Sequence, residues 1–562
     1  MNMLKREEND KYRSTIKNTI EFDPEILKRY VNFMNNPDEE TAVAQFGRDD
    51  KYFGVCTMMA AMPGLPMFGH GQVEGFEEKY GMEYRKAYRD EQPDNALVAR
   101  HHREIFPLMK KRYIFAGVEH FHLYDFWENG TVNENVFAWT NRAGTERALI
   151  LYNNAYQQAS GWIQRSAAYA EKLPDGSKQL VQKNLWEGLG LTDRENRYCI
   201  MQEQRSRLWF IRTVREIVTN GFFAALNGFQ TQVFLNIQEI DDNEEGHYRQ
   251  LHETLGGAGI PDIHMGIQNI VLRDLYTALS EFISPDYIQT VRTLLNLETK
   301  KIDDKRAAFF KTVHKSAIAF FAEASRLPGF DEPKSTTDKA FARYRLYMER
   351  LFAVASLKKN GNAKEYDELL SIAAVLFALR HVVAPPVTGA KCRKLISRYD
   401  LDRKMIEILS GYGFDPARTE AFLSDMGDFL TNRDLLDEPT TGTRWVSFFN
   451  SAEIQRQMNV HPWDKILWFG KEQSEHMIEL LRLSMVLFRD CDESIKSTKT
   501  GNLEATLAKF TMLFTDSGYQ FEKLIEGITG KKPGKTASSK KAATGTTEAV
   551  VPPGNTTKKK KP

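Results

Sequence analysis

The sequence predicts a mixed α and β protein with a β/α segment, an antiparallel β-sandwich domain and a large α-helical domain. Three observations lead to this prediction. Strand and helix patterns alternate over residues 1–117, short aromatic and β-branched runs fill residues 118–242, and helical patterns dominate residues 243–530. Residues 531–562 contain nine Lys, one Glu and no aromatic residue, so we expect a disordered tail.

The first segment reads as strand, helix, strand, helix. Residues 30–35 form a short apolar strand pattern, residues 39–62 a helical one and residues 64–68 a second strand pattern. Residues 95–115 read as a further helix, with Pro107 marking a kink or break. Two such units cover only one edge of a parallel sheet, so this segment alone is an incomplete domain.

The later segments contain fewer features that suggest chemistry. Trp127, Trp139 and Trp209 lie in the predicted β domain and could stack on sugar rings, although we expect core packing instead. In the helical domain, residues 363–382, 417–431 and 473–490 have helical patterns, and residues 463–472 (WDKILWFGKE) are read as helical packing. The pair His252-Glu253 lacks the second His of a zinc-protease helix, so we expect no metal there and no cofactor elsewhere.

Charge and hydropathy argue against several classes of protein. The 562 residues carry 76 Lys and Arg against 75 Asp and Glu, a net charge of +1, which argues against a dedicated nucleic-acid binder. No apolar run approaches the ~20 residues of a membrane span, so we expect no membrane partner. The charged N-terminus lacks a secretory signal, and the four cysteines are widely spaced, so we expect a cytoplasmic protein with reduced thiols.

Two polar segments follow the two predicted strands. After the first strand, Asn35-Asn36-Pro37 leads into Asp38, Glu39 and Glu40. In β/α barrels the carboxyl ends of the strands build the active site, which makes Asp38 a catalytic candidate. The alternative is that an acid after Pro simply caps the following helix.

The second polar segment, residues 63–75 (PGLPMFGHGQVEG), is rich in glycine. Glycines allow the backbone to approach a ligand closely, and His70 and Gln72 could donate hydrogen bonds to hydroxyl groups. The spacing matches neither a phosphate loop nor a dinucleotide fingerprint. The alternative is a tight turn with a purely structural role.

These segments together resemble glycoside hydrolase family 13, the α-amylase family. Residues 33–38 (FMNNPD) look like the Phe-x-x-Asn-His-Asp segment after barrel strand seven, and Gly64-x-Pro66 with Gly71-Gln72 is similar to the Gly-x-Pro…Gly-Glu segment on strand eight. Residues 74–88, 97–108 and 132–154 look like the last loop, the last helix and the C-terminal β domain of long bacterial members. The resemblance covers residues 10–155 and, more weakly, residues 196–240.

The resemblance implies that residues 1–117 are the C-terminal end of a (β/α)8 barrel, with a β domain over residues 118–242. Such enzymes use a retaining mechanism with a carboxylate nucleophile and a carboxylic acid. Of their three acids only the third, the transition-state stabiliser, matches a residue of this chain, namely Asp38, with Asn36 and Gln72 lining the same pocket. Pro37 replaces the usual His, and no segment of the 562 residues matches the nucleophile or the acid.

Two main functions remain open at this point, and a third possibility is a purely helical scaffold whose barrel remnant is vestigial. The chain is either the C-terminal part of an α-amylase-like hydrolase acting on an α-glucan or maltooligosaccharide, or a non-catalytic carbohydrate-binding or protein-interaction protein derived from one. In the first case a separate chain could supply the upstream barrel. In either case little hydrolysis is expected from this chain alone.

Overall fold

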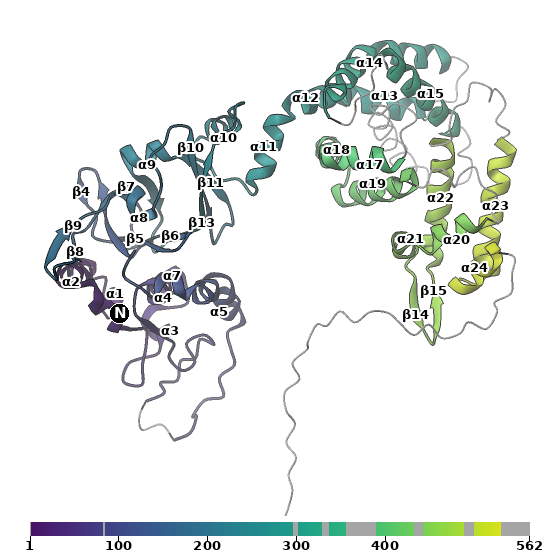
Figure 1. Ribbon diagram of the computed structural model, residues 1–562. Helices are drawn as coiled ribbons and strands as arrows, with labels where there is room; N and C mark the ends of the chain where they lie inside the picture. The colour runs from purple at the N-terminus through teal and green to yellow at the C-terminus, as the bar shows by residue number, and fades with distance from the viewer. Residues whose placement is uncertain are drawn as a thin grey trace, which may run out of the picture. The chain divides into compact units, whose positions relative to one another are not determined.

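The computed structural model describes residues 2–81, 85–295, 302–328, 337–355, 389–431, 442–487 and 500–529 (Figure 1). The chain forms two compact units, unit 1 (Met1–Arg273) and unit 2 (Asp274–Pro562). The mixed α and β class is confirmed. The helical pattern over residues 363–382 and the Lys-rich tail lie outside the described residues.

Unit 1 begins with the predicted strand and helix alternation. Its first elements are α1 (Asn2–Lys5), α2 (Asn9–Phe22), the 3-10 helix η1 (Pro24–Arg29), β1 (Val31–Phe33), α3 (Ala42–Phe46), α4 (Asp50–Ala61) and β2 (Leu65–Met67). β1 and β2 pair in parallel, with Val31 opposite Leu65, and within the described residues they pair only with each other. The single helix expected over residues 39–62 is wrong, because Gly47 at φ 74° ends α3 and a second helix starts at Asp50.

The helix expected over residues 95–115 is interrupted where Pro107 predicts a break. The structure has α5 (Asn95–Arg100), a π-helical turn η2 (His101–Ile105), α6 (Phe106–Lys110) and α7 (Arg112–Phe115). Proline has no N–H for the carbonyl one turn earlier, and its ring crowds that carbonyl. The π-helical turn relieves this conflict by admitting one extra residue.

The β domain is one nine-stranded sheet with antiparallel pairing throughout. The strand order is β11-β10-β13-β6-β5-β3-β7-β12, with β4 attached to β3, while β8 and β9 form a separate hairpin. The elements are β3 (His122–Glu128), β4 (Thr131–Val132), β5 (Val136–Ala143), β6 (Glu146–Asn153), β7 (Ala159–Ser166), β8 (Tyr169–Lys172), β9 (Lys178–Val181), α8 (Leu185–Leu189), β10 (Arg197–Glu203), β11 (Trp209–Thr213), α9 (Val214–Asn220), β12 (Phe222–Leu226), β13 (Thr231–Asp241), α10 (His247–Leu255) and α11 (Ile263–Val271).

The sheet curls so that its two halves face each other. Phe222 on β12 meets Phe234 on β13, five strands away, with ring centroids 5.3 Å apart. The halves enclose an apolar core, as the two layers of a sandwich do, but they belong to one continuous sheet instead of the two sheets of an ordinary sandwich.

Both faces of the central strands are buried. On β5, Val136 and Ala138 point into the core inside the curl, whereas Phe137 and Trp139 point to the opposite face. There they pack with α4 and α7, and the Trp139 indole N–H donates to the carbonyl oxygen of Ala61 at 3.2 Å. Because the β/α segment and the sheet share this core, residues 1–273 form one compact unit.

A buried arginine fastens α2 to the sheet. Arg13 is 1% exposed and pairs with Asp125 at 3.2 Å and with Glu134 at 2.7 Å. Its guanidinium also donates to the backbone carbonyl oxygens of Tyr124 and Val136. A buried charge is stable only when it is paired and hydrogen-bonded in this way.

Unit 2 is helical apart from one hairpin in its described residues. Its elements are α12 (Arg273–Phe282), α13 (Pro285–Leu295), α14 (Ile302–Ser325), α15 (Thr337–Ala355), α17 (Gly389–Arg398), α18 (Leu401–Gly411), α19 (Pro416–Thr431), α20 (Thr443–Phe449), α21 (Ala452–Gln457), β14 (His461–Trp463), β15 (Ile466–Trp468), α22 (Lys471–Leu487), α23 (Thr500–Asp516) and α24 (Phe521–Thr529). The helical patterns over residues 417–431 and 473–490 coincide with α19 and most of α22.

The helical interpretation of residues 463–472 is wrong for residues 463–468, whereas Phe469 is buried and Lys471 begins α22. Residues 461–468 form the β14–β15 hairpin, with Asp464 and Lys465 at positive φ in its turn. Trp463 is 68% exposed instead of packed inside. The short alternating run was too brief for its periodicity to separate a strand from a helix.

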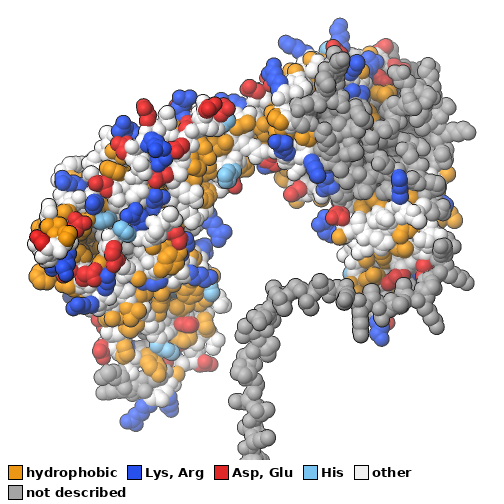
Figure 2. Space-filling model, in the orientation of Figure 1, with side chains coloured by type: hydrophobic (Ala, Val, Ile, Leu, Met, Phe, Trp, Pro, Cys, Tyr) orange, Lys and Arg blue, Asp and Glu red, His pale blue; other side chains and the backbone are white. Residues whose placement is uncertain are grey.

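The surface agrees with the balanced composition. Figure 2 shows acidic and basic side chains interspersed over the visible described face of each unit, without a broad area of one sign. Among the described residues, no helix is both long enough and apolar enough to cross a bilayer. Cys56 and Cys199 are free and buried, as expected.

Candidate functional site

Asp38 lies in the turn directly after β1. The Asn36 side-chain oxygen accepts hydrogen bonds from the backbone N–H groups of Asp38 and Glu39, both at 3.0 Å. This turn directs the Asp38 side chain into solvent, where it is exposed. The cap of the next helix is Thr41, whose hydroxyl accepts from Ala44. Asp38 therefore does not cap the following helix, which excludes the purely structural alternative proposed for it above.

Gln72 lies in the turn after β2 and points into the protein. Its side chain is 2% exposed, its Oε1 accepts from the N–H of Gly69 at 3.0 Å, and its Nε2 faces the sulfur of Met34 at 3.4 Å. The Tyr52 hydroxyl donates to the Gln72 carbonyl oxygen at 2.7 Å. Gln72 thus fixes the shape of the glycine turn from inside, and its amide does not reach the surface.

His70 occupies the exposed part of the same turn. Its imidazole ring lies 4.5 Å from the ring of Tyr80, which is 45% exposed. Lys79, next to Tyr80, donates to the backbone oxygen of Asp38 at 2.8 Å. The loop after β2 therefore crosses the loop after β1 at the carboxyl ends of the two strands.

Three of the four predicted site residues lie on these two crossing loops. Asn36, Asp38 and His70 lie on the crossing loops, whereas the side chain of Gln72 is buried beneath them. Within the described residues, no hydrogen bond or ion pair engages the Asp38 carboxylate. One exposed carboxylate can accept hydrogen bonds from sugar hydroxyls. Retaining hydrolysis also needs two further carboxyl groups, a nucleophile and an acid, about 5 Å apart.

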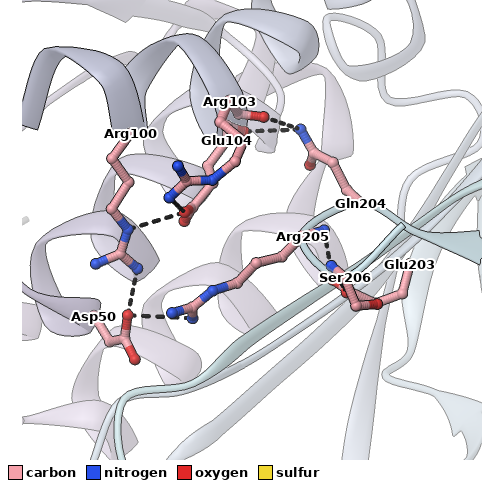
Figure 3. Close-up of polar contacts among 8 residues, drawn as sticks. All are labelled: Asp50, Arg100, Arg103, Glu104, Glu203, Gln204, Arg205 and Ser206. Carbon is pink, nitrogen blue, oxygen red and sulfur yellow. Dashed lines mark hydrogen bonds and ion pairs between the residues drawn. The ribbon is translucent and has the colours of Figure 1, made fainter. Parts of the chain in front are cut away.

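A second polar cluster, which the sequence did not predict, joins the helices to the sheet (Figure 3). Arg100 at the end of α5 pairs with Asp50 and, through Nε at 3.0 Å, with Glu104. Arg205, in the loop between β10 and β11, reaches the same Asp50 carboxylate at 3.2 Å. Gln204 from that loop donates to the carbonyl oxygen of Glu104 at 3.0 Å.

This cluster has a structural role. Its charged side chains pair with one another, and the Arg100 guanidinium lies 4.0 Å from the ring centroid of Phe53. The pocket between these side chains has an inner void of about 20 Å³, which is room for about one water and not for a sugar. The partners are far apart in the sequence, so no local signal could have revealed the cluster.

The described residues contain no group of three or more His, Cys, Asp or Glu side chains arranged to hold a metal ion. His252 instead faces the Glu216 carboxylate at 3.7 Å.

Comparisons with known proteins give partial and distant matches. No protein-family model matches the chain, and neither does any curated protein. Among solved structures, the chain is similar to the α-amylase of Geobacillus thermoleovorans in complex with acarbose, with 9% identity, a TM-score of 0.24, and coverage of 38% of this chain and 39% of that chain. An Anoxybacillus α-amylase gives 10% identity, a TM-score of 0.23, and coverage of 37% and 38%. The chain spans about two fifths of these enzymes, and TM-scores this low define neither a shared fold nor a shared activity.

Proposed function

We propose that this chain is the C-terminal part of an α-amylase-like glycoside hydrolase acting on α-glucans. In this proposal β1 and β2 are the last two strands of the catalytic barrel, and Asp38 stabilises the transition state. The nucleophile and the acid come from outside this chain, in an upstream segment or a separate polypeptide.

One observation carries the proposal. β1 and β2 are parallel and joined by helices, so their carboxyl ends share one edge, and Asp38 and His70 follow those ends on loops that touch through Lys79. In β/α barrels this edge carries the chemistry. The segment resemblance around Asp38 and Gln72 then selects glycoside hydrolysis among the chemistries that such an edge can support.

The role proposed for Asp38 follows from its environment. The Asp38 carboxylate is exposed and has no partner among the residues that the structure describes, so it can accept hydrogen bonds from two hydroxyls of a distorted sugar. These bonds strengthen as positive charge develops on the ring, so they contribute more in the transition state than in the ground state. Asn36 holds the turn that presents this carboxylate.

A non-catalytic carbohydrate-binding protein is the second candidate. Asp38 is open to solvent, and within the described residues β1 and β2 have no further strand neighbours to build a closed pocket. A binding protein needs no nucleophile, and this difference in chemistry separates the two candidates.

The test is the release of reducing ends from maltoheptaose by the chain alone and by the chain mixed with the polypeptide encoded upstream. We expect no hydrolysis by the chain alone and hydrolysis by the mixture. Asp38→Asn should lower the rate of the mixture by at least about 10³-fold. Glu40→Gln is the matched control, because Glu40 is an exposed acid two residues away, and it should leave the rate unchanged.

Two results would decide against the proposal. Hydrolysis by the chain alone would mean that the catalytic acids are misassigned. An inactive mixture, with maltoheptaose still bound by the chain, would favour the non-catalytic candidate.

A further inference from the structure

Three aromatic side chains form a row across one end of the curled sheet. Trp127 on β3 is directly opposite Trp162 on β7, and Trp162 is directly opposite Phe223 on β12, the terminal strand. Directly opposite residues of antiparallel strands share a face of the sheet. The Trp162 and Phe223 rings lie 5.2 Å apart at an angle of 59°.

This aromatic row faces solvent. Trp127 is 47%, Trp162 38% and Phe223 48% exposed, whereas their chain neighbours Phe126 and Ile163 are fully buried in the core. Side chains alternate between the faces of a strand, so the burial of one set directs the other outward. The expectation that Trp127 packs in the core is therefore wrong, although it holds for Trp139.

The area of the row indicates the size of its ligand. If each side chain has about 200 Å² of surface, the exposed fractions leave roughly 250 Å² of aromatic surface. A stable protein interface buries about 800 Å² on each partner. The row is therefore too small for a second copy of the chain or a folded protein partner, and it suits a ligand that a few aromatic rings can hold.

The surroundings of the row indicate the charge of that ligand. Ser160 and Gln164 flank Trp162 on the same face of β7, and Ala225 flanks Phe223 on β12. None of these three side chains is charged. Two carboxylates of β3 do lie beside the row, but both are engaged: Asp125 pairs with Arg13 and Lys17, and Glu128 accepts from the N–H of Ser160 at 2.7 Å. Gln164 is held in place by a hydrogen bond from its Nε2 to the Thr219 carbonyl oxygen at 2.8 Å. The charged groups beside the row are thus already paired or hydrogen-bonded, which leaves neutral side chains to meet a ligand.

From this arrangement we infer that the row is a carbohydrate-binding site separate from the Asp38 loops, and that it takes a neutral glucan chain. The apolar C–H face of a pyranose packs on an aromatic plane, while its hydroxyl groups can bond to the hydroxyl of Ser160 and the amide of Gln164. Neighbouring strands are about 4.8 Å apart, so three strands spread the rings over about 10 Å, enough for more than one sugar unit. The choice of an α-linked glucan rests on the proposed function, whereas the carbohydrate class rests on the row itself.

The experiment is a calorimetric titration of the full chain with maltoheptaose, with intrinsic tryptophan fluorescence as a second readout. Trp162→Ala removes the central ring and should weaken binding about tenfold, and Trp127→Ala or Phe223→Ala should weaken it about threefold to tenfold. Tyr156→Ala is the matched control, because this aromatic is 81% exposed but lies outside the row, and it should bind like the wild type.

The outcomes separate this site from the proposed function. Equal affinity of the wild type and Trp162→Ala, with both folded by near-ultraviolet circular dichroism, would overturn the site. A change in sedimentation of Trp162→Ala without a change in sugar affinity would also overturn it, in favour of a protein contact. If cellohexaose binds to the row as tightly as maltoheptaose, the carbohydrate site stands and its assignment to α-glucans is overturned.

Discussion

Acidification below pH 6.5 is expected to destabilise unit 1, because His101 is buried there in its neutral form. His101 is fully buried in the π-helical turn, among the rings of Tyr52, Phe53 and Phe106. Tyr52 gives its hydroxyl proton to Gln72, so the tautomer that fits has Nε2–H donating to the Tyr52 oxygen at 2.9 Å. His101 Nδ1 then has no proton and, among the described residues, no hydrogen-bond partner.

The size of the effect follows from the pKa of this imidazole. Burial lowers the pKa of His101 to about 4, from an ordinary value of 6.5. Because the folded-state pKa is depressed, the unfolded chain takes up the proton first. Stability is therefore complete above pH 6.5 and falls as the pH drops from 6.5 towards 4. The linkage relation gives a loss of about 2 kcal/mol at pH 5 from this group alone.

The assay is differential scanning calorimetry of the full chain at pH 7.5 and pH 5. His101→Gln keeps a side-chain N–H for Tyr52 but cannot become charged. Its unit 1 transition should lose about 4–8 °C less than that of the wild type, since 1 kcal/mol shifts Tm by about 2–4 °C in a domain of this size. His102→Gln is the matched control, because His102 is the exposed neighbour in the same turn, and it should behave like the wild type.

An equal loss of Tm in the wild type and His101→Gln would refute this reasoning. Burial also lowers the pKa of His122 on β3 to about 4, and this side chain is 5% exposed. His101→Gln combined with His122→Gln should therefore lose still less. If only the double variant differed from the wild type, His122 and not His101 would be the acid-sensitive group.

Two further predictions concern other buried groups of unit 1. Arg13→Met should lower the free energy of unfolding, measured by urea titration, by about 3–5 kcal/mol. The variant leaves Glu134 and two backbone oxygens without their cation. A loss under about 1 kcal/mol would contradict the role of Arg13 in fastening α2. Cys56 and Cys199 should resist alkylation by iodoacetamide in the native protein. Burial raises the pKa of both thiols, that of Cys199 to about 12. Rapid alkylation of either cysteine, detected by mass spectrometry, would show that the core opens.

Local sequence patterns predicted the elements that are defined by short apolar runs, turn residues or proline. β1 and β2 carry short apolar runs between turn residues, and the chemistry of Pro107 marked the position of the π-helical turn. Failures came where one residue changed the backbone. Gly47 ended a helix that the periodicity would have continued, and the turn at Asp464 and Lys465 carries no glycine to announce a hairpin.

The candidate site was predicted only in part. Asp38 and Asn36 lie in a turn directly after β1, where chain order alone placed them. The direction of the Gln72 side chain depends on Met34, Cys56 and Met59, which come from other elements and close around it. Trp162 and Phe223 were not singled out, because β7 and β12 are distant in the sequence and become neighbours only in the sheet.

The sequence by itself determined which stretches become strands and helices over much of unit 1, because hydrophobic period, proline and turn residues act within a few positions. It also set the near-zero net charge. The tertiary structure alone decided that β3–β7 and β10–β13 form one curled sheet, that Arg100 and Arg205 share Asp50, and that the aromatic row faces water. These features depend on which strands pair and which faces are covered, and pairing between distant segments is fixed by the packing of the whole unit and not by any local pattern.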